Sequence, residues 1–190
     1  MSRSPLAAAV ILLAASFATA ATSSAAHAQG AALDDATIVA IFNAANTADV
    51  ETGALAEKRA STKELRDFGA MLARDHKMVR QQGRDLAAKL GVTPTPPKDD
   101  QGARDHAAAM ARLRTLEGAE FDRAFLQHEI AFHQAVIDAI NGTLLPAIQN
   151  EELKALVEKV APAFQAHTQM AQELQKKIAS ARAGDHSSSS

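Results

Sequence analysis

Four long segments of the chain repeat apolar residues at steps of three and four, and an ionisable residue interrupts the apolar stripe in each of them. This spacing places the apolar residues on one face of an α-helix. The segments cover roughly residues 35–60, 61–90, 119–141 and 151–181. Four amphipathic helices with short connections bury their stripes against one another, so the pattern predicts a four-helix bundle.

The composition agrees with an all-α fold and excludes several other classes of protein. Alanine accounts for 44 of the 190 residues, and the chain has no Cys, Trp or Tyr. Alanine has the highest helix propensity, whereas a β-sandwich needs more β-branched and aromatic residues. The lack of cysteine excludes disulfide frameworks, Cys-ligated metal sites and thiol catalysis. The net charge of −2 does not indicate a nucleic-acid-binding protein.

The N-terminal segment 1–28 has the features of a secretory signal peptide. An apolar run over residues 6–21 follows Arg3, and Ala26-His27-Ala28 is a small-x-small cleavage signature. We therefore expect cleavage after Ala28 and a periplasmic or secreted protein. The route predicted is Sec, because no twin-Arg motif precedes the run, and no lipobox cysteine follows it. We expect no membrane span in the mature chain.

Capping residues and helix breakers predict where the elements begin and end. The sequence Ser61 to Glu64 has the form of a capping box, and Gly91 suits the position after the second helix. The Pro-rich segment 92–98 cannot be helical. A short extra helix is expected over about residues 103–116, and Asn150 is the expected N-cap of the fourth long helix.

These signals predict one folded domain with two loose ends. Residues 29–34 are expected to form a flexible mature N-terminus, and residues 35–181 the four-helix bundle domain. The Ser-rich residues 182–190 are expected to be a disordered tail.

The ionisable residues within the apolar stripes are the main functional signal in the sequence. A buried ion without a partner costs several kcal/mol, so these groups are expected to meet each other, a metal or water. In four-helix bundles, inward Glu and His side chains from facing helices build metal sites. Imidazole suits zinc, copper or iron. The candidate ligands of a single transition metal ion are Glu51, His76, Glu129, His133 and His167.

Counting residues from a turn predicts how well these groups align along the helix axes. With a turn near Pro146, His133 lies 13 residues before it and His167 lies 21 residues after it. At ~1.5 Å per residue, this is an offset of ~12 Å between the two histidines. We therefore expect His133 at the edge of a cluster formed by Glu51, His76, Glu129 and His167.

Several motifs together resemble a known family. They are Asp75-His76, Glu120 to Phe125 (EFDRAF), His133, and Pro162 with His167, in combination with Glu51. This set is similar to the exported bacterial family called domain of unknown function 4142, over about residues 35–177. The resemblance implies a ferritin-like antiparallel four-helix bundle in the periplasm. It implies no established chemistry. The residues themselves predict the short extra helix between the second and third long helices.

The candidate ligands depart from the pattern of a di-iron ferritin site. That site needs two Glu-x-x-His pairs and two further carboxylates. The third long helix instead has Glu129 and His133 four residues apart, and Phe164 stands three residues before His167. Ferroxidase activity is therefore not expected, and no catalytic residue is predicted.

Two interpretations of the inward polar residues stay open. In the first, the exported bundle binds one metal ion through them. In the second, the His/Glu network is structural, and the protein is a non-catalytic envelope or stress-associated binding or interaction module. Both are compatible with a homo-oligomer. An enzyme with His–Glu acid–base chemistry would need an open cleft at His76 or His133. Asp75 is expected to pair with Arg123 across the second and third long helices.

Overall fold

The computed structural model describes residues 33–187 of the chain, with side chains through Ala181. The signal peptide predicted over 1–28, most of the predicted mature N-terminus, and residues 188–190 lie outside the described residues. The described part contains helices and no strand. In the same part of the chain, no helix is both long enough and apolar enough to cross a membrane.

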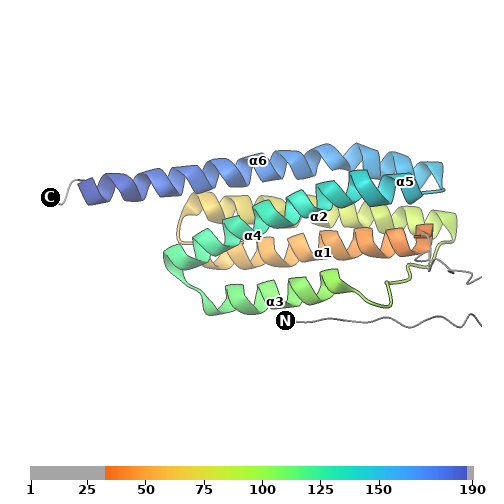
Figure 1. Cartoon of the computed structure of the whole chain (residues 1–190), viewed down its shortest axis with the longest axis horizontal. Helices are drawn as coiled ribbons and strands as arrows, with labels where there is room; N and C mark the ends of the chain where they lie inside the picture. Colours follow the sequence, from red (N-terminus) through yellow and green to blue (C-terminus); the bar gives the residue numbers. More distant parts are fainter. Residues whose placement is uncertain (1–32, 188–190) are drawn as a thin grey trace, which may run out of the picture. The chain divides into compact units, whose positions relative to one another are not determined.

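Four long helices form an antiparallel bundle (Figure 1). They are α1 (Asp35–Arg59), α2 (Lys63–Leu90), α4 (Gly118–Ala139) and α6 (Glu151–Ser187). Both α1 and α6 pack against α2 and α4, so the four helices close into a ring around a shared interior. A shorter helix, α3 (Gln101–Thr115), lies outside this ring and contacts α1 and α4. The predicted all-α bundle with a short extra helix between the second and third long helices is confirmed.

Local sequence signals account for most of the helix ends. The side chain of Asp34 caps α1 by accepting a 2.7 Å hydrogen bond from the amide of Thr37. Asn150 caps α6 by accepting from the amide of Leu153 at 3.1 Å, as predicted. Gly91 ends α2 in the left-handed conformation with a φ of 66°, which a glycine adopts without strain.

The prediction that Ser61 is the N-cap of the second long helix is wrong by one residue. Thr62 is the N-cap of α2 and accepts a 3.2 Å hydrogen bond from the amide of Leu65. Ser61 has another partner: its amide donates to a carboxylate oxygen of Asp122 at 3.0 Å, and its hydroxyl donates to the other. These bonds tie the α1–α2 turn to the first turns of α4.

The third long helix does not stop at Asn141 as expected. It continues through a π-helical turn, η1 (Ile140–Leu144), and a short helix, α5 (Leu145–Ala147), so the chain turns only at residues 148–150. Measured from residue 149, His133 lies 16 residues before the turn and His167 lies 18 residues after it. The axial offset is then about 3 Å, and the two histidines stand at nearly the same level.

Two glycines set the close approach of α1 and α2. A Cβ atom on Gly53 would lie 2.6 Å from the carbonyl oxygen of Gly69, and one on Gly69 would lie 2.7 Å from the carbonyl oxygen of Gly53. Any larger residue at either position would force the backbones apart. The short distance between the helices allows side chains of α1 to contact those of α2 in the bundle interior.

Buried apolar side chains gather in two clusters, which we call the end clusters. One lies near the α1–α2 turn and includes Leu72 and Phe125. The other lies near α5 and the start of α1 and includes Ile38 and Val157. Between the two end clusters, the buried side chains are mostly polar.

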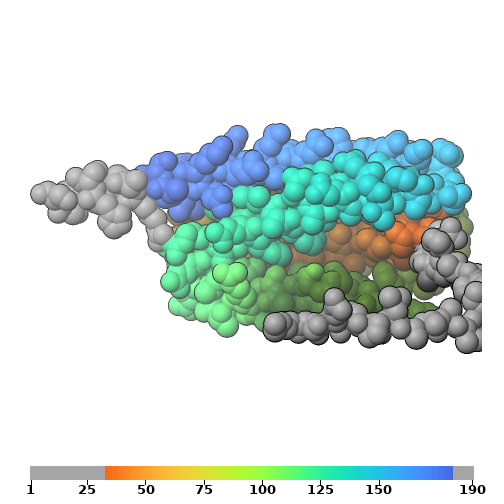
Figure 2. Space-filling model, in the orientation of Figure 1, coloured from red at the N-terminus to blue at the C-terminus, as the bar shows by residue number. Residues whose placement is uncertain are grey.

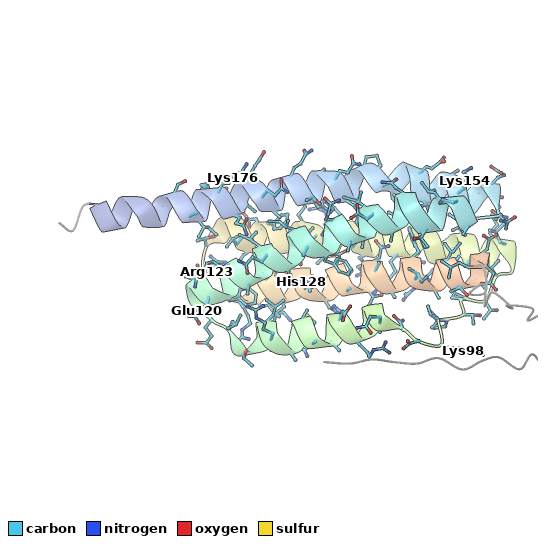
Figure 3. All side chains as sticks on the ribbon, in the orientation of Figure 1. Lys98, Glu120, Arg123, His128, Lys154 and Lys176 are labelled. Atoms are coloured by element: carbon cyan, nitrogen blue, oxygen red, sulfur yellow. The ribbon has the colours of Figure 1, made fainter. Side chains whose placement is uncertain are left out.

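The solvent-exposed surface of the bundle carries charged side chains. On the face shown in Figure 2, α4 and α6 lie side by side and contact each other. Glu120 and Lys176 are exposed on the outside of the helices, and Lys98 is exposed on the connector before α3 (Figure 3). The ionisable groups of the interior are therefore a separate set, and they define the candidate site.

Candidate metal centre

A layer of buried polar side chains separates the two end clusters, and we call it the central polar layer. Each of its residues is at most 6% exposed, and each long helix contributes at least one. The layer consists of Asn46, Asp49 and Thr52 of α1, His76 of α2, Glu129 and His133 of α4, and His167 and Thr168 of α6. Buried polar groups without partners destabilise a protein core. A layer with this many polar side chains is therefore expected to have partners that compensate for their burial.

Three imidazole rings form the middle of this layer. The ring centroid of His76 lies 5.1 Å from that of His167 and 5.5 Å from that of His133, and those of His133 and His167 are 5.5 Å apart. One ring nitrogen of each histidine lies within 4.8 Å of the other two. The ring of Phe164 packs against them, 5.0 Å from His76. Ring nitrogens from three helices therefore meet in one buried space.

The orientation of the His76 ring follows from its contact with α1. Its Nδ1 lies 2.9 Å from Oδ1 of Asn46. The amide nitrogen of Asn46 donates to the carbonyl of Phe42 at 2.8 Å, so the amide oxygen is the atom that faces His76. A carboxylate oxygen of Asp49 lies 3.3 Å from the same Nδ1. Because both neighbours are acceptors, the proton of the neutral His76 ring belongs on Nδ1.

The other two rings are held in the same way by outer acceptors. Nδ1 of His133 lies 3.0 Å from the backbone carbonyl oxygen of Glu129 and donates to it. Nε2 of His167 lies 3.4 Å from the carboxylate of Asp75, which Arg74 also holds at 2.9 Å. These neighbours place the ring protons on Nδ1 of His133 and on Nε2 of His167.

One unprotonated nitrogen is left on each ring, namely Nε2 of His76, Nε2 of His133 and Nδ1 of His167. The atoms from His76 and His167 are 3.2 Å apart, and Nε2 of His133 is buried without a hydrogen-bond partner in the protein. Histidines that bind metals typically donate the outer N–H to a carboxylate or carbonyl oxygen and bind with the other nitrogen. In all three rings, a protein oxygen lies beside the outer nitrogen and leaves the other nitrogen available.

Burial keeps the three imidazoles neutral. Burial and the neighbouring histidines lower the pKa of His76 to about 2. Burial lowers the pKa of His133 to about 3. Burial also lowers the pKa of His167, although the Asp75 carboxylate acts in the opposite direction. Neutral imidazole is the form that binds a metal ion, so these rings can do so without first losing a proton to solvent.

Two buried carboxylates complete the layer. Burial raises the pKa of Asp49 well above its usual value, and the charge of Glu129 raises it further. Burial raises the pKa of Glu129 to about 7. None of their four oxygens has a hydrogen-bond partner in the protein. The pair therefore favours either protons or a cation in its immediate surroundings.

The structure corrects the position expected for Glu51. Its side chain is 49% exposed, and its carboxylate lies 2.9 Å from Nε2 of His106 on α3. The inward carboxylate of α1 is Asp49. Residues two apart in an α-helix point about 200° apart, so the two side chains lie on opposite faces. The other four candidate ligands, His76, Glu129, His133 and His167, are brought together, with His133 inside the cluster and not at its edge.

Asp49 and Asn46 were missed because alanine is spread around α1 and leaves its inward face poorly defined. The stripe predicted through Glu51 differs from the observed one by about half a turn. A better signal was available: Phe42, the largest apolar side chain of the helix, lies on the same face as Ile38 and Gly53. Extending that face at helical spacing includes Asn46 and Asp49.

Asp75 does not pair with Arg123 as expected. Its carboxylate lies between Arg74 and His167, whereas Nη1 of Arg123 is buried and has no hydrogen-bond partner in the protein. Asp75 therefore belongs to the outer acceptors that orient the three imidazoles, and it is the most exposed of them.

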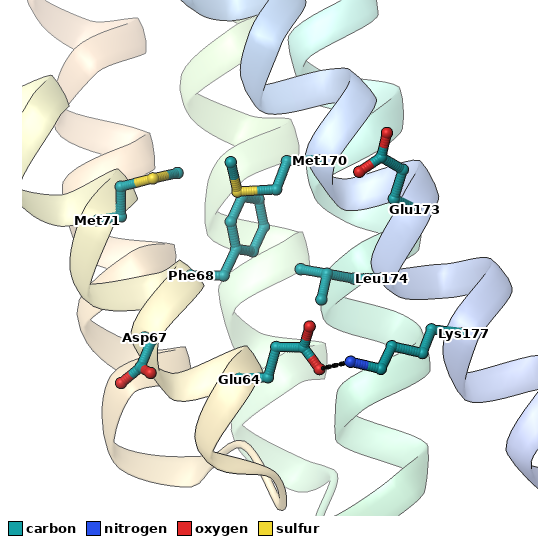
Figure 4. A pocket seen from close by; sticks show the side chains of 8 residues that line it. All are labelled: Glu64, Asp67, Phe68, Met71, Met170, Glu173, Leu174 and Lys177. Carbon is teal, nitrogen blue, oxygen red and sulfur yellow. Dashed lines mark hydrogen bonds and ion pairs between the residues drawn. The ribbon is translucent and has the colours of Figure 1, made fainter.

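An open groove of about 400 Å³ lies between α2 and α6 (Figure 4). Met71 and Met170 extend into it, and an ion pair of 2.6 Å between Lys177 and Glu64 crosses its other end. None of the three central histidines lines this groove. It is therefore not the open cleft at His76 or His133 that acid–base catalysis requires.

Comparison with known proteins agrees with this fold. The structure is similar to CopM in the Cu(II)-bound form, with a TM-score of 0.60 and 16% sequence identity, over 76% of this chain and 98% of that chain. At this identity, the likeness shows a shared fold. No curated protein matches the sequence. A family model described as Domain of unknown function (DUF4142) matches residues 19–174. This match covers most of the sequence, and the chain therefore belongs to the DUF4142 family.

Proposed function

We propose that this protein is an exported metal-binding protein that holds a single transition metal ion between His76, His133 and His167. The observation that carries the proposal is the orientation of the rings. Each ring has a protein oxygen beside its outer nitrogen. The inner nitrogens of His76 and His167 lie 3.2 Å apart, and His133 has a ring nitrogen within 4.8 Å of one on each of the other two rings. This is how imidazole ligands are arranged around a metal.

The contact between His76 and His167 supports a cation at this place. Two imidazole lone pairs 3.2 Å apart repel each other when no proton or cation lies between them. If the proton of His167 moved to Nδ1, this nitrogen could donate a hydrogen bond to Nε2 of His76. Nε2 of His167 would then turn a lone pair toward the Asp75 carboxylate. A metal ion bound to both nitrogens removes the repulsion and keeps the bond to Asp75.

The alternative of a purely structural His/Glu network fits the same residues less well. A structural network is expected to satisfy its own hydrogen bonds, because half-satisfied buried networks are destabilising. Here Nε2 of His133 and both carboxylates of the layer have no partner in the protein. Such unpaired atoms are expected where a ligand completes the network.

The choice of metal follows from the ligand set. Neutral imidazoles suit zinc, copper, iron and nickel among the common divalent ions. The likeness to CopM in its Cu(II)-bound form makes Cu(II) the first ion to test, with Zn(II) as the second. The signal-peptide features of residues 1–28 support export, and an N-terminus at Gln29 in the protein recovered from outside the cytoplasm would establish it.

The test is metal binding by the metal-depleted mature chain. We expect one equivalent of Cu(II) or Zn(II) by elemental analysis, and nitrogen hyperfine structure in the Cu(II) electron paramagnetic resonance spectrum. At free metal about 100 times above Kd, binding stabilises the fold by about 2.7 kcal/mol. This corresponds to a rise in Tm of about 5–11 °C for a chain of this size.

A matched pair of variants separates specific from adventitious binding. His133→Gln removes a central imidazole, whereas His106→Gln removes the partly exposed imidazole that contacts Glu51. We expect His133→Gln to lose the tight equivalent and the Tm rise, and His106→Gln to keep both. Equal metal affinity in the two folded variants, or an unchanged Tm of the unsubstituted protein with either metal, would contradict the proposal.

A further inference from the structure

Asp49 and Glu129 lie on the other side of the His76 and His133 rings from the three-imidazole site. The carboxylate of Asp49 lies 3.3 Å from Nδ1 of His76 and 3.8 Å from Nδ1 of His133. The carboxylate of Glu129 lies 3.5 Å from the same Nδ1 of His133. The two nitrogens of an imidazole point in divergent directions. An ion bound to Nε2 of both rings is therefore not positioned to take these carboxylates as ligands.

The two carboxylates form a buried pair without a Lys or Arg partner among the described residues. Asp49 is 1% exposed and Glu129 is 0% exposed, and none of their four oxygens has a hydrogen-bond partner in the protein. Among the described residues, no Lys or Arg nitrogen lies within 4.0 Å of either carboxylate, and the basic side chains that come this close are the imidazoles of His76 and His133. With both groups ionised and uncompensated, the pair would be strongly destabilising, so it needs a proton or a cation.

We infer that Asp49 and Glu129 bind a second, oxygen-preferring divalent cation beside the three-imidazole site. Asp49, Glu129 and His133 each have a potential ligand atom within 4.8 Å of those of the other two, so the two carboxylates are close enough to bind one ion at about 2.0–2.6 Å. His133 is a neighbour of this site and not a ligand, because its Nδ1 carries the ring proton and donates to the carbonyl oxygen of Glu129. Carboxylate oxygens suit Mn²⁺, Mg²⁺ and Ca²⁺. A charge of +2 balances the two carboxylates.

His133 connects this carboxylate site to the three-imidazole site. Its Nδ1 faces the carboxylates and its Nε2 is the free atom on the other side. A cation held by Asp49 and Glu129 lies close to the Nδ1–H of His133, so its charge should change the affinity of Nε2 for the other ion, and the reverse. The carboxylate site uses ligand atoms different from those of the three-imidazole site, so either site can exist without the other.

The probe for the carboxylate site is Mn²⁺, because its free form gives a quantifiable electron paramagnetic resonance signal. The metal-depleted mature chain is titrated with Mn²⁺ before and after loading with one equivalent of Zn(II). We expect one saturable Mn²⁺ per chain in both cases, with different Kd values. Absence of saturable Mn²⁺ binding in both titrations would mean that the carboxylates share a proton only, and would overturn the inference.

Variants assign the bound Mn²⁺ to this pair. Asp49→Asn and Glu129→Gln keep the shape of the side chains and remove one negative charge each. Mn²⁺ affinity should therefore fall at least about tenfold, since even substitution of residues that only hydrogen-bond to a metal ligand has an effect of this size. The matched control is Asp122→Asn, since Asp122 is also buried, at 2% exposure, but is hydrogen-bonded to Ser61. It should bind Mn²⁺ as the unsubstituted protein does. Unchanged Mn²⁺ affinity in Glu129→Gln would overturn the inference.

A further variant keeps this inference separable from the proposed function. His167→Gln removes a ligand of the three-imidazole site alone, so it should lose tight Cu(II) binding and keep Mn²⁺. Loss of Mn²⁺ in this variant would show that a single site binds both ions, and would overturn the inference. Mn²⁺ binding by a protein that binds neither Cu(II) nor Zn(II) would instead refute the proposed function and leave the carboxylate site standing.

Discussion

The two end clusters and the central polar layer lie in the same bundle interior but have opposite physical character. The end clusters bury Leu, Ile, Val and Phe side chains with almost no polar atoms. The layer between them buries three imidazoles and two carboxylates, and several of their polar atoms have no partner in the protein. Apolar burial stabilises the fold, whereas unpaired buried polar groups oppose it.

This difference indicates a division of roles along the bundle axis. The end clusters hold the four helices in place from both sides, so the layer between them can contain groups that destabilise the metal-free protein. Proteins commonly place such groups at functional sites and compensate for them elsewhere. Substitutions in the two regions should therefore have opposite effects on stability, and this contrast can be tested.

The largest effect should come from an end cluster. Phe125→Ala removes a fully buried ring that stacks on Phe121 and contacts Phe68. We expect a loss of about 3–5 kcal/mol in the free energy of unfolding, measured by urea or thermal unfolding of the metal-free protein. The partly buried Phe132 offers a control, and Phe132→Ala should cost less. Equal costs at the two positions would contradict the assignment of the stabilising core to the end clusters.

The next effect should have the opposite sign and should depend on pH. Burial raises the pKa of Glu129 from 4.5 to about 7, so the folded protein binds more protons than the unfolded chain between these values. Ionised Glu129 therefore destabilises the metal-free protein above its folded pKa. At 1.36 kcal/mol per pKa unit, the cost at pH 8 is about 3 kcal/mol.

Glu129→Gln removes this ionisation. The metal-free variant should be more stable than the unsubstituted protein by up to about 3 kcal/mol at pH 8, and the difference should shrink as the pH falls toward 4.5. The charge of Glu129 also raises the pKa of Asp49, so its removal lowers the cost of ionising Asp49 and acts in the same direction. Urea unfolding of both proteins at pH 5 and pH 8 measures it. A difference that does not change with pH would contradict the prediction.

A smaller effect is expected where α1 and α2 approach each other. Gly69→Ala would place its Cβ 2.7 Å from the carbonyl oxygen of Gly53, so the helices must separate, at a cost of about 1–3 kcal/mol. Separation also pulls Asn46 away from His76, so Zn(II) affinity should fall. The control is Gly142→Ala, where an added Cβ meets no atom within 4 Å. Equal unfolding free energies in the two variants would show that the close approach is not required.

The smallest effect should come from Glu51, which the sequence had suggested as a ligand. Glu51→Gln breaks an exposed contact with His106, and such contacts contribute about 0–1 kcal/mol. We expect the stoichiometry and Kd for Zn(II) and Mn²⁺ to be unchanged, by calorimetric titration. A tenfold loss of metal affinity in this variant would place the metal centre on the outer face of α1 and would overturn the location proposed here.

Much of the fold and part of the candidate site could be predicted from the sequence, because the relevant signals are local. The N-cap at Asn150 and the left-handed Gly91 depend on a few neighbouring residues. The apolar stripes of the second, third and fourth long helices were clear enough to identify His76, His133 and His167 as inward residues. The stripe of α1 was not, because alanine on every face of a helix favours no orientation.

The sequence by itself determined an all-α bundle with inward histidines, because helix propensity, capping and apolar spacing act over one or two turns. Only the tertiary structure decided which carboxylate of α1 faces inward, since that depends on the fit of Gly53 against Gly69. It also decided the level of His133, because the helix continues through η1 and α5, and this placed His133 opposite His167. The division into a three-imidazole site and a carboxylate site follows from how the rings are turned, and their orientation depends on acceptors contributed by residues far apart in the sequence.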